Sequence, residues 1–248
     1  MMPHALITGG QQGIGLGIAA ALAAAGFRLT LAAEQPEDAR VVREALERLP
    51  DGTRYFRHDL TRIDAIAALL DAVGEITTLV SNAGVPAMAR GDLLDMAPES
   101  FDRCMAVNLR GTFFLAQEAA RRMLRRRSAT YRSLIFVTSI SAAMASPERA
   151  EYCISKAGAA MMAQNFALRL APEGIGVFEL RPGIIATPMT EGVRDRYTAR
   201  IEAGLVPAAR WGEPSDIGQT IVPLATGQMP FATGAAIPVD GGLSIPRL

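Results

Sequence analysis

Short apolar segments rich in β-branched residues alternate along the chain with longer segments of helical periodicity. The apolar segments predict strands at residues 4–8, 28–33, 54–58, 77–81, 133–138, 176–180 and 236–239. The segments between them predict helices at residues 15–25, 36–49, 62–73, 98–126, 152–170 and 214–224. Continuous apolar strands have both faces covered, and regular strand–helix alternation gives parallel crossovers. The pattern predicts an α/β fold with a doubly wound, seven-stranded parallel sheet and helices on both faces.

The chain has no internal repeat, low-complexity tract or Pro/Ser-rich linker, so we expect one domain over residues 1–248. Half of the residues are apolar, which suffices for one substantial core. The start lacks the basic and apolar segments of a signal peptide, and the longest weakly polar stretch, at 13–27, is too short to span a membrane. We expect a soluble cytoplasmic protein without a membrane partner.

Charge and composition exclude several classes of protein. The 25 basic and 25 acidic side chains balance, which argues against nucleic acid as the main partner. The only cysteines and histidines, Cys104, Cys153, His4 and His58, match no disulfide framework or zinc motif, so we expect no metal. Among the 25 basic residues the single lysine is Lys156, and all others are arginine.

A glycine-rich turn follows the first predicted strand, with the sequence Thr8-Gly9-Gly10-Gln11-Gln12-Gly13-Ile14-Gly15. Ligands of parallel sheets bind beyond the carboxyl ends of the strands. Glycines there allow unusual backbone angles and let a diphosphate approach the N–H groups of a helix N-terminus. The GxxxGxG spacing therefore predicts a dinucleotide site. The alternative is that these glycines serve only close packing of strand and helix.

Glu34, at the end of the second predicted strand, bears on which dinucleotide is bound. A carboxylate there accepts hydrogen bonds from ribose hydroxyls, whereas a ribose phosphate needs a cation. Neither the glycine turn nor the residues from the strand end to Ala39 include an arginine. We therefore expect NAD(H), with NADP(H) as the alternative. Glu34 can also be read as a solvated residue of the next helix.

Two further strand ends fit a cofactor site. Asp59 follows the third strand, where its carboxylate can accept from an adenine amino group. Asn82-Ala83-Gly84 follows the fourth strand, where small residues permit close contact with a cofactor. Each can instead be a helix cap or a turn.

Tyr152 and Lys156 lie four residues apart at the start of a predicted helix, so they project from one face. A phenol has a pKa of about 10, and a nearby ammonium lowers it toward neutral pH. Because lysine occurs nowhere else, a chance surface pair is a poor explanation. Ser139, after the fifth strand, can donate to a substrate carbonyl while Tyr152 transfers the proton, and Ser141 is the competing serine.

These motifs resemble the short-chain dehydrogenase/reductase family, and within it the 3-ketoacyl-(acyl-carrier-protein) reductase-like branch. The resemblance covers nearly the whole chain and is carried by Thr8-Gly9…Gly13-Ile14-Gly15, Asp59-Leu60, Asn82-Ala83-Gly84, Asn108, Ser139, Tyr152…Lys156, Pro182-Gly183…Thr187 and Val239-Asp240-Gly241-Gly242. It implies a Rossmann fold and reversible, NAD(P)-dependent hydride transfer between a nicotinamide and a carbonyl or secondary alcohol.

The resemblance also implies roles for individual residues. Tyr152 is the general acid/base, Lys156 lowers its pKa and binds the nicotinamide ribose, and Ser139 polarises the carbonyl. Asn108 holds a water in a proton relay, or else is a buried amide that kinks its helix. The expected cofactor contacts are Gly9, Gln11, Gln12, Gly13, Ile14, Gly15, Glu34, Asp59, Leu60, Asn82, Ala83, Gly84, Tyr152, Lys156, Pro182, Gly183, Ile185 and Thr187, with Thr187 near the carboxamide.

Three departures from the family pattern bear on the cofactor. Ser81 replaces the usual first asparagine of Asn-Asn-Ala-Gly. The acid of NAD-linked members falls at Ala33, and Glu34 is one residue later, so strand alternation turns it to the other face. Gln11-Gln12 replaces the basic residue of NADP-linked members, which favours NAD(H).

Substrate contacts are expected from residues 140–151 and from a lid at about 188–210, with Met144, Arg149, Glu151 and Met189 as pocket candidates. The basic run from Arg121 to Arg127 reads as a solvated helix end, or as a docking site for an acyl carrier protein. The resemblance implies a homotetramer with the apolar tail, 231–248, in subunit contacts. The rival functions are a dinucleotide-sensing protein without turnover and a methyltransferase, and neither explains the Tyr152–Lys156 pair.

Overall fold

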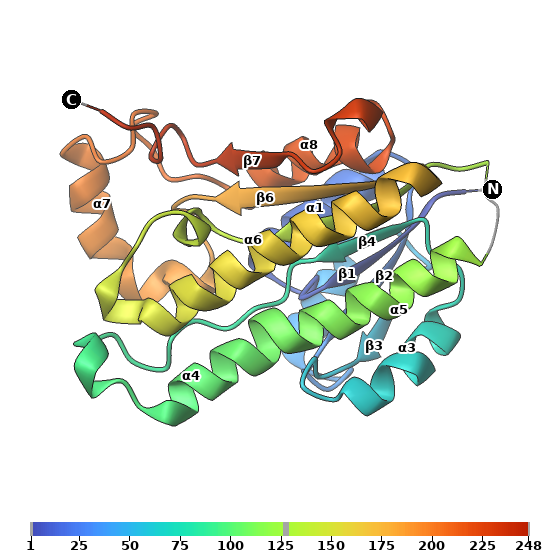
Figure 1. Cartoon of the computed structure of the whole chain (residues 1–248), viewed down its shortest axis with the longest axis horizontal. Helices are drawn as coiled ribbons and strands as arrows, with labels where there is room; N and C mark the ends of the chain where they lie inside the picture. The colour runs from blue at the N-terminus through green and yellow to red at the C-terminus, as the bar shows by residue number, and fades with distance from the viewer. Residues whose placement is uncertain (1, 126–128, 248) are drawn as a thin grey trace.

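The computed structural model describes residues 2–125 and 129–247 (Figure 1). Within these ranges the strands form one seven-stranded sheet in the order β3-β2-β1-β4-β5-β6-β7, with every neighbouring pair parallel. The strands are β1 (His4–Thr8), β2 (Arg28–Ala33), β3 (Arg54–Arg57), β4 (Thr78–Ser81), β5 (Arg132–Val137), β6 (Ile175–Pro182) and β7 (Ala236–Val239). The predicted α/β fold and doubly wound sheet are confirmed. The strand order reverses between β1 and β4, which is where ligands of such sheets bind.

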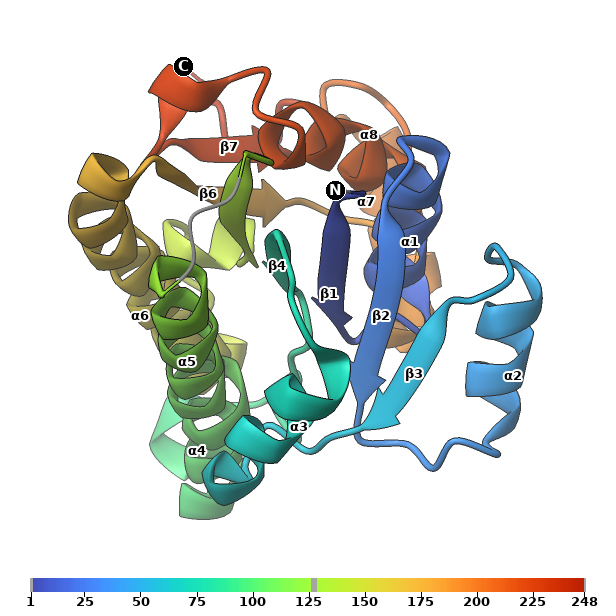
Figure 2. The same ribbon diagram turned by 90° about the vertical axis from the view of Figure 1, so that its right-hand side faces the viewer.

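Helices cover both faces of the sheet (Figure 2). One layer holds α1 (Gly13–Ala24), α2 (Arg40–Glu47) and α8 (Pro214–Ala225), and the other holds α3 (Ile66–Val73), α5 (Thr112–Leu124) and α6 (Ala150–Leu170). Neighbouring strand residues serve opposite layers: Ile7 packs into the α1 and α8 core, and Leu6 into the α3, α5 and α6 core. Both side chains are fully buried, which explains why consecutive residues in the middle of β1 are apolar.

Several helices differ from the predicted ranges. The prediction for 36–49 was too long, because Pro36 to Ala39 form a turn that precedes α2. The predicted helix at 98–126 consists of α4 (Pro98–Cys104), a π-helical segment (Met105–Gly111) and α5. At Gly111 an added Cβ would lie 2.2 Å from the Leu60 carbonyl oxygen, so the irregular segment packs directly on that backbone. The end of the prediction, Arg126, lies outside the described residues.

Residues 188–210, predicted as a lid, contain a 3₁₀ segment (Pro188–Val193) and a further helix, α7 (Arg194–Glu202). Helix α7 lies beyond the carboxyl ends of β6 and β7. In Figure 1 the arrows of both strands point toward the side of the molecule where α7 lies. Ile201 on α7 is buried with Val206 and Leu243, so the segment packs on the C-terminal residues. In the described part of the chain, no helix combines the length and apolar character needed to cross a membrane.

Candidate active site

The glycine turn between β1 and α1 forms one wall of a groove at the carboxyl edge of the sheet. Gly9 and Gly13 have φ angles of +65° and +51°, a region that residues with a Cβ rarely adopt. At Gly15 an added Cβ would lie 2.0 Å from the Gly9 carbonyl oxygen. The turn therefore requires glycine at all three positions, and it leads into the N-terminus of α1, where backbone N–H groups favour an anion.

Asn82 and Thr8 hold this turn in place. The Asn82 Nδ2 donates to the carbonyl oxygens of Thr8 at 3.0 Å and Gly9 at 3.2 Å. The Thr8 hydroxyl oxygen accepts from the backbone N–H groups of Asn82 and Ala83, both at 3.0 Å. The switch point between β1 and β4 is thus tied together by side chains. The role of Thr8 was not assigned from the sequence, although its place at the strand end was the available signal.

Most of the predicted site residues come together in this groove. Its lining consists of Gly9, Gln11, Gln12, Gly13, Ile14, Gly15, Glu34, Asn82, Ala83, Gly84, Val137, Thr138, Tyr152, Lys156, Thr187, Pro188 and Met189. Thr187 closes it opposite the glycine turn, since a Cβ on Gly13 would lie 3.3 Å from the Thr187 side chain. The glycine turn and the Tyr152–Lys156 pair therefore belong to one continuous site.

Glu34 lies at one end of the groove in a hydrogen-bonded chain of side chains. Gln11 Nε2 donates to Gln35 Oε1 at 2.8 Å, and Gln35 Nε2 donates to Glu34 Oε1 at 2.6 Å. We expected strand alternation to direct Glu34 to the opposite face of the sheet. Glu34 instead follows the last residue of β2 and lines the groove. Gln11 Oε1 is buried without a hydrogen-bond partner, which leaves an acceptor available at the glycine turn.

Arg57 places a cation beside this end of the groove. Its Nε donates to the backbone oxygen of Glu34 at 3.1 Å. Arg57 belongs to β3, far in the sequence from the glycine turn and from the residues after β2, so the absence of an arginine in those two segments does not exclude it. The parallel pairing of β2 with β3 brings Arg57 opposite Ala33.

Five predicted cofactor residues do not line the groove. Asp59 is exposed and its carboxylate accepts from the Thr61 N–H. This hydrogen bond closes a turn, which was the alternative interpretation of Asp59. Leu60 is buried in the core under α3 and α5. The others are Pro182, Gly183 and Ile185.

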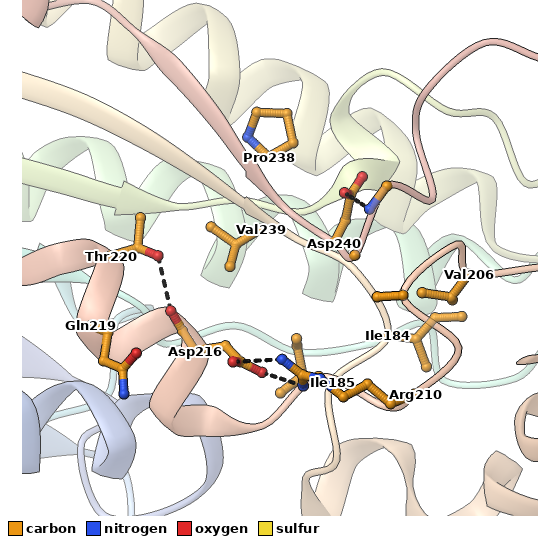
Figure 3. A pocket seen from close by; sticks show the side chains of 14 residues that line it. Ile184, Ile185, Val206, Arg210, Asp216, Gln219, Thr220, Pro238, Val239 and Asp240 are labelled. Carbon is orange, nitrogen blue, oxygen red and sulfur yellow. Dashed lines mark hydrogen bonds and ion pairs between the residues drawn. The ribbon is translucent and has the colours of Figure 1, made fainter.

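Ile185 instead lines a separate pocket of about 520 Å³ between β6, β7 and α8 (Figure 3). There Arg210 donates to both carboxylate oxygens of Asp216, at 2.7 and 2.9 Å. Arg210 and Asp216 are therefore paired with each other, and the third charged group of this pocket, Asp240, accepts from the backbone N–H groups of Gly242 and Ser244. The Ile185 side chain is buried in the core beside α8, so only its backbone can reach toward the groove.

Lys156 is buried beside the Tyr152 ring. Its Nζ lies 5.7 Å from the ring centroid and donates to the Val137 carbonyl oxygen at 3.1 Å. Burial lowers the pKa of Lys156 to about 8, against the opposing influence of Cys104 and Glu179. The ammonium is therefore mostly charged at neutral pH and loses its proton in mild alkali.

Burial raises the pKa of Tyr152, whereas a hydrogen bond with Ser139 and the charge of Arg149 act in the opposite direction. The net shift is upward. This is opposite to the lowering that we predicted from Lys156, because the phenol lies in a buried environment where its ionised form is poorly solvated. Tyr152 is consequently a protonated acid at neutral pH.

The structure distinguishes between the two candidate serines. The Ser139 hydroxyl acts directly on the Tyr152 phenol and lowers its pKa, and its oxygen accepts from the Ser141 N–H at 3.1 Å. The Ser141 hydroxyl is buried and accepts from Arg149 Nη2 at 3.1 Å. Ser139 is therefore the serine that faces the phenol.

Asn108 lies in the π-helical segment and holds the loop after β4. Its Oδ1 accepts from the Val85 N–H at 2.7 Å, and its Nδ2 donates to Val85 O and Ser155 Oγ, both at 3.0 Å. Asn108 is thus a buried amide in an irregular helix, which was the alternative interpretation of this residue. Its water relay stays a prediction.

A buried acid, Glu179 on β6, supports the end of β5 and was not identified from the sequence. It accepts from the Thr138 hydroxyl at 2.6 Å and from Arg181 at 2.8 and 3.0 Å. Only 2% of Glu179 is exposed, so its pairing with Arg181 offsets the cost of burying the charge. Thr138 precedes Ser139, and this network therefore positions the turn that carries Ser139.

The remaining pocket candidates lie in different surroundings. Glu151 is buried and accepts from the Ser100 hydroxyl at 2.6 Å, so it joins α6 to α4 and does not face a substrate pocket. Met189 is exposed and lines the groove, and Met144 is exposed. Within the described residues, no cluster of His, Cys, Asp and Glu could hold a metal ion.

Known proteins resemble this chain over its whole length. The family profile described as Enoyl-(Acyl carrier protein) reductase matches residues 9–244. The 3-oxoacyl-[acyl-carrier-protein] reductase MabA of Mycobacterium bovis is 34% identical over 97% of this chain and 92% of its own length.

Solved structures agree with that assignment. A 3-oxoacyl-[acyl-carrier protein] reductase from Brucella melitensis in complex with NAD is 50% identical, covers 100% of this chain and 99% of its own, and has a TM-score of 0.94. A putative 2-deoxy-D-gluconate 3-dehydrogenase from Agrobacterium tumefaciens with bound NADP is 31% identical over 97% and 96%, with a TM-score of 0.85. Together with the fold and the groove, these similarities establish that the chain belongs to the short-chain dehydrogenase/reductase family of NAD(P)-dependent oxidoreductases.

Proposed function

We propose that the chain catalyses reversible reduction of a substrate carbonyl to a secondary alcohol, with Tyr152 as proton donor, Ser139 as carbonyl-binding hydroxyl and Lys156 as a cofactor-binding cation. The observation that carries this proposal is the joining of Tyr152, Lys156 and the glycine turn in one groove, where Ser139 acts on the phenol. A dinucleotide-sensing protein or a methyltransferase would have no use for this combination of groups.

The groove's features fit a nicotinamide dinucleotide. The glycine turn has a close-packed backbone that leaves no room for a Cβ at Gly9 or Gly15, and the unpartnered Gln11 Oε1 offers an acceptor beside it. The glycine turn and the N-terminus of α1 would hold the diphosphate, Glu34 the adenosine ribose, and Lys156 and Thr187 the nicotinamide end. When bound, the cofactor supplies or accepts the hydride.

The protein's part in the reaction is positioning and proton transfer. Ser139 donates its hydroxyl hydrogen to the substrate carbonyl oxygen and so favours the negative charge that develops there. Tyr152 then gives its phenolic proton to that oxygen. The raised pKa of Tyr152 keeps this proton in place at neutral pH, which favours the direction of reduction. The ammonium of Lys156 stabilises the phenolate that remains.

For the cofactor we favour NAD(H) over NADP(H). Glu34 lies in the groove, where its charge would repel a ribose phosphate, and the glycine turn has no basic residue. Arg57 lies beside Glu34 and is the one feature here that favours the phosphate. The nearby relatives include a protein with NAD and another with NADP.

A 3-oxoacyl group is the substrate type that the relatives' names favour. A carrier protein as partner and a cytoplasmic location stay predictions. The basic run does not strengthen the proposal of a carrier protein. Arg122 in this run pairs with Glu118 and Asp71. Arg122 also lines a pocket with His4 and Arg28, which lies at the opposite edge of the sheet from Tyr152. Arg126 and Arg127, the end of the run, lie outside the described residues.

We also propose a homotetramer in which the C-terminal edge of the sheet forms a contact. Strand β7 has a neighbour on one side only, and Phe231 and Ile245 beside it are exposed. Large exposed apolar side chains at an unpaired strand are typical of subunit contacts. A monomer in light scattering at micromolar concentration would contradict this arrangement.

The decisive experiment is the substitution Tyr152→Phe, assayed by nicotinamide absorbance with a panel of ketones and alcohols and with both cofactors. Loss of the phenolic proton should reduce kcat by about 10²–10⁴-fold. Cofactor binding, followed by nicotinamide fluorescence, should persist because the ring remains. Equal turnover by the wild type and the variant would remove Tyr152 from the mechanism.

A further inference from the structure

Arg149 places a guanidinium next to the proposed reacting centre. Its Cζ lies 5.3 Å from the centroid of the Tyr152 ring, and its Nη2 donates to Ser141 at 3.1 Å. Arg149 precedes α6, and Ser141 follows β5, so this cation is attached to the two elements that carry Tyr152 and Ser139. The mechanism proposed above gives Arg149 no contact with substrate or cofactor, although its charge lowers the pKa of Tyr152.

The positive charge of Arg149 has no carboxylate partner among residues 2–125 and 129–247. The two nearest acids in the sequence are engaged elsewhere, Glu148 with Arg196 at 3.6 Å and Glu151 with Ser100. The Nε of Arg149 is buried and has no hydrogen-bond acceptor. Unpaired N–H groups of this kind are costly in a folded protein, and a ligand that supplies an acceptor is a common reason for one.

Tyr197 on α7 faces the same charge from the lid side. Although burial raises the pKa of Tyr197, a hydrogen bond with Arg90 and the charges of Arg149 and Arg200 bring it below its usual value. The charges of Arg90, Arg149 and Arg200 therefore all act on this phenol, and the Arg200 guanidinium lies 5.9 Å from its ring centroid.

We propose that Arg149 binds a carboxylate carried by the substrate itself, so that the natural substrate is a small oxo acid or hydroxy acid. This inference rests on the proposed function and names its substrate class. The distance of 5.3 Å from the Tyr152 ring places the anion within a few bonds of the reacting carbon. A phosphate at the far end of a long carrier arm would lie too far away to meet this guanidinium.

The test compares acids with neutral analogues of the same shape. The probes are acetoacetate and methyl acetoacetate, a wider panel of oxo and hydroxy acids with their methyl esters, and acetoacetyl-CoA as a thioester. Each is assayed with the wild type, Arg149→Gln and Arg149→Lys, using NADH and NADPH. Arg196→Gln is the matched control, because Arg196 is an exposed arginine on α7 that already pairs with Glu148.

The wild type should prefer acids to their esters. Arg149→Gln should raise KM for the acids by roughly ten-fold or more, since a charge-assisted hydrogen bond is lost, and should leave the esters unchanged. Arg149→Lys should keep part of the preference, and Arg196→Gln should keep all of it. Fluorescence titration with NADH and a thermal melt should show that each variant is folded and binds cofactor.

Three results would overturn the proposal while the proposed function stands. The first is a wild type that uses esters or the thioester as well as the acids. The second is an equal loss of kcat on acids and esters in Arg149→Gln with a shifted pH profile, which would mean that Arg149 acts on Tyr152. The third applies if Arg149→Gln does not fold. In that case, an Arg149→Lys variant that uses acids and esters equally well, as the wild type then also does, would overturn the proposal. No turnover of any compound by the wild type would instead overturn the proposed function.

Discussion

The side-chain amide of Asn82 donates a 3.2 Å hydrogen bond to the carbonyl oxygen of Gly9, so the loop after β4 fixes the turn after β1. The same Nδ2 reaches the Thr8 carbonyl at 3.0 Å. These two strands are neighbours in the sheet but lie far apart in the sequence. The shape of the cofactor cradle therefore depends on one amide from a distant segment.

Asn82→Ala should loosen this turn. Loss of the amide leaves two carbonyl oxygens without donors, which should lower the free energy of unfolding by about 1–2 kcal/mol. We expect the affinity for NADH, measured by fluorescence titration, to fall by about ten-fold. Asn165→Ala is the matched control, because the Asn165 amide only bonds the Met161 carbonyl on its own exposed helix face. An unchanged NADH affinity in Asn82→Ala would contradict this role.

Glu34 and Arg57 should set the choice between the two cofactors in opposite directions. Glu34→Ala removes the carboxylate that would repel a ribose phosphate and leaves Arg57 beside the vacated site. We expect the ratio of kcat/KM with NADH to that with NADPH to drop by about ten-fold. Adding Arg57→Ala should reverse much of the gain with NADPH. If Glu34→Ala changes both cofactors equally, Glu34 does not contact the ribose.

The rate of carbonyl reduction should fall in mild alkali. The pKa of Lys156 is lowered to about 8, so its charge is present below that pH and is lost as pH rises through it. We expect kcat to be level near neutral pH and to decline above about pH 8, in a profile recorded with saturating cofactor. Glu179 raises the pKa of Lys156, so Glu179→Gln should move the decline to lower pH. A decline that begins only near pH 10 would show that Lys156 titrates as an exposed lysine does.

Acid should destabilise the fold through His4. Burial, together with the charges of Arg28 and Arg54, lowers the pKa of His4 from 6.5 to about 4. The unfolded chain then binds more protons between these values, so the free energy of unfolding falls as pH drops from 6.5 to 4. The His4 contribution should be on the order of 3 kcal/mol.

Urea unfolding at a series of pH values measures this effect. His4→Gln should be less stable at neutral pH, because the His4 ring nitrogens lie within hydrogen-bond distance of Thr30 and the Glu75 carbonyl. Its stability should nevertheless depend less on pH than that of the wild type. His58→Gln is the comparison, since the pKa of His58 is also lowered by burial. Parallel pH curves for the wild type and His4→Gln would refute the assignment.

The alternation of strands and helices could be predicted because it depends on local hydrophobic periodicity. All of the strands were found within two residues of their predicted ends, because β1, β2, β4, β5 and β6 are almost entirely buried and short apolar runs mark them in the sequence. The helix prediction for 98–126 was less accurate. The π-helical segment at Met105–Gly111 accompanies the close approach of Gly111 to Leu60, a contact that no local pattern contains.

The sequence by itself determined the class of fold, the glycine turn and the Tyr152–Lys156 pair, because spacing along a strand or helix is a local property. Only the tertiary structure decided that Ser139 faces the phenol, that Ser141 bonds Arg149, and that Glu179 bonds Thr138, the residue before Ser139. It also decided the direction of the Tyr152 pKa shift. Burial and the distances between charges follow from how distant segments pack, and residue order alone does not specify them.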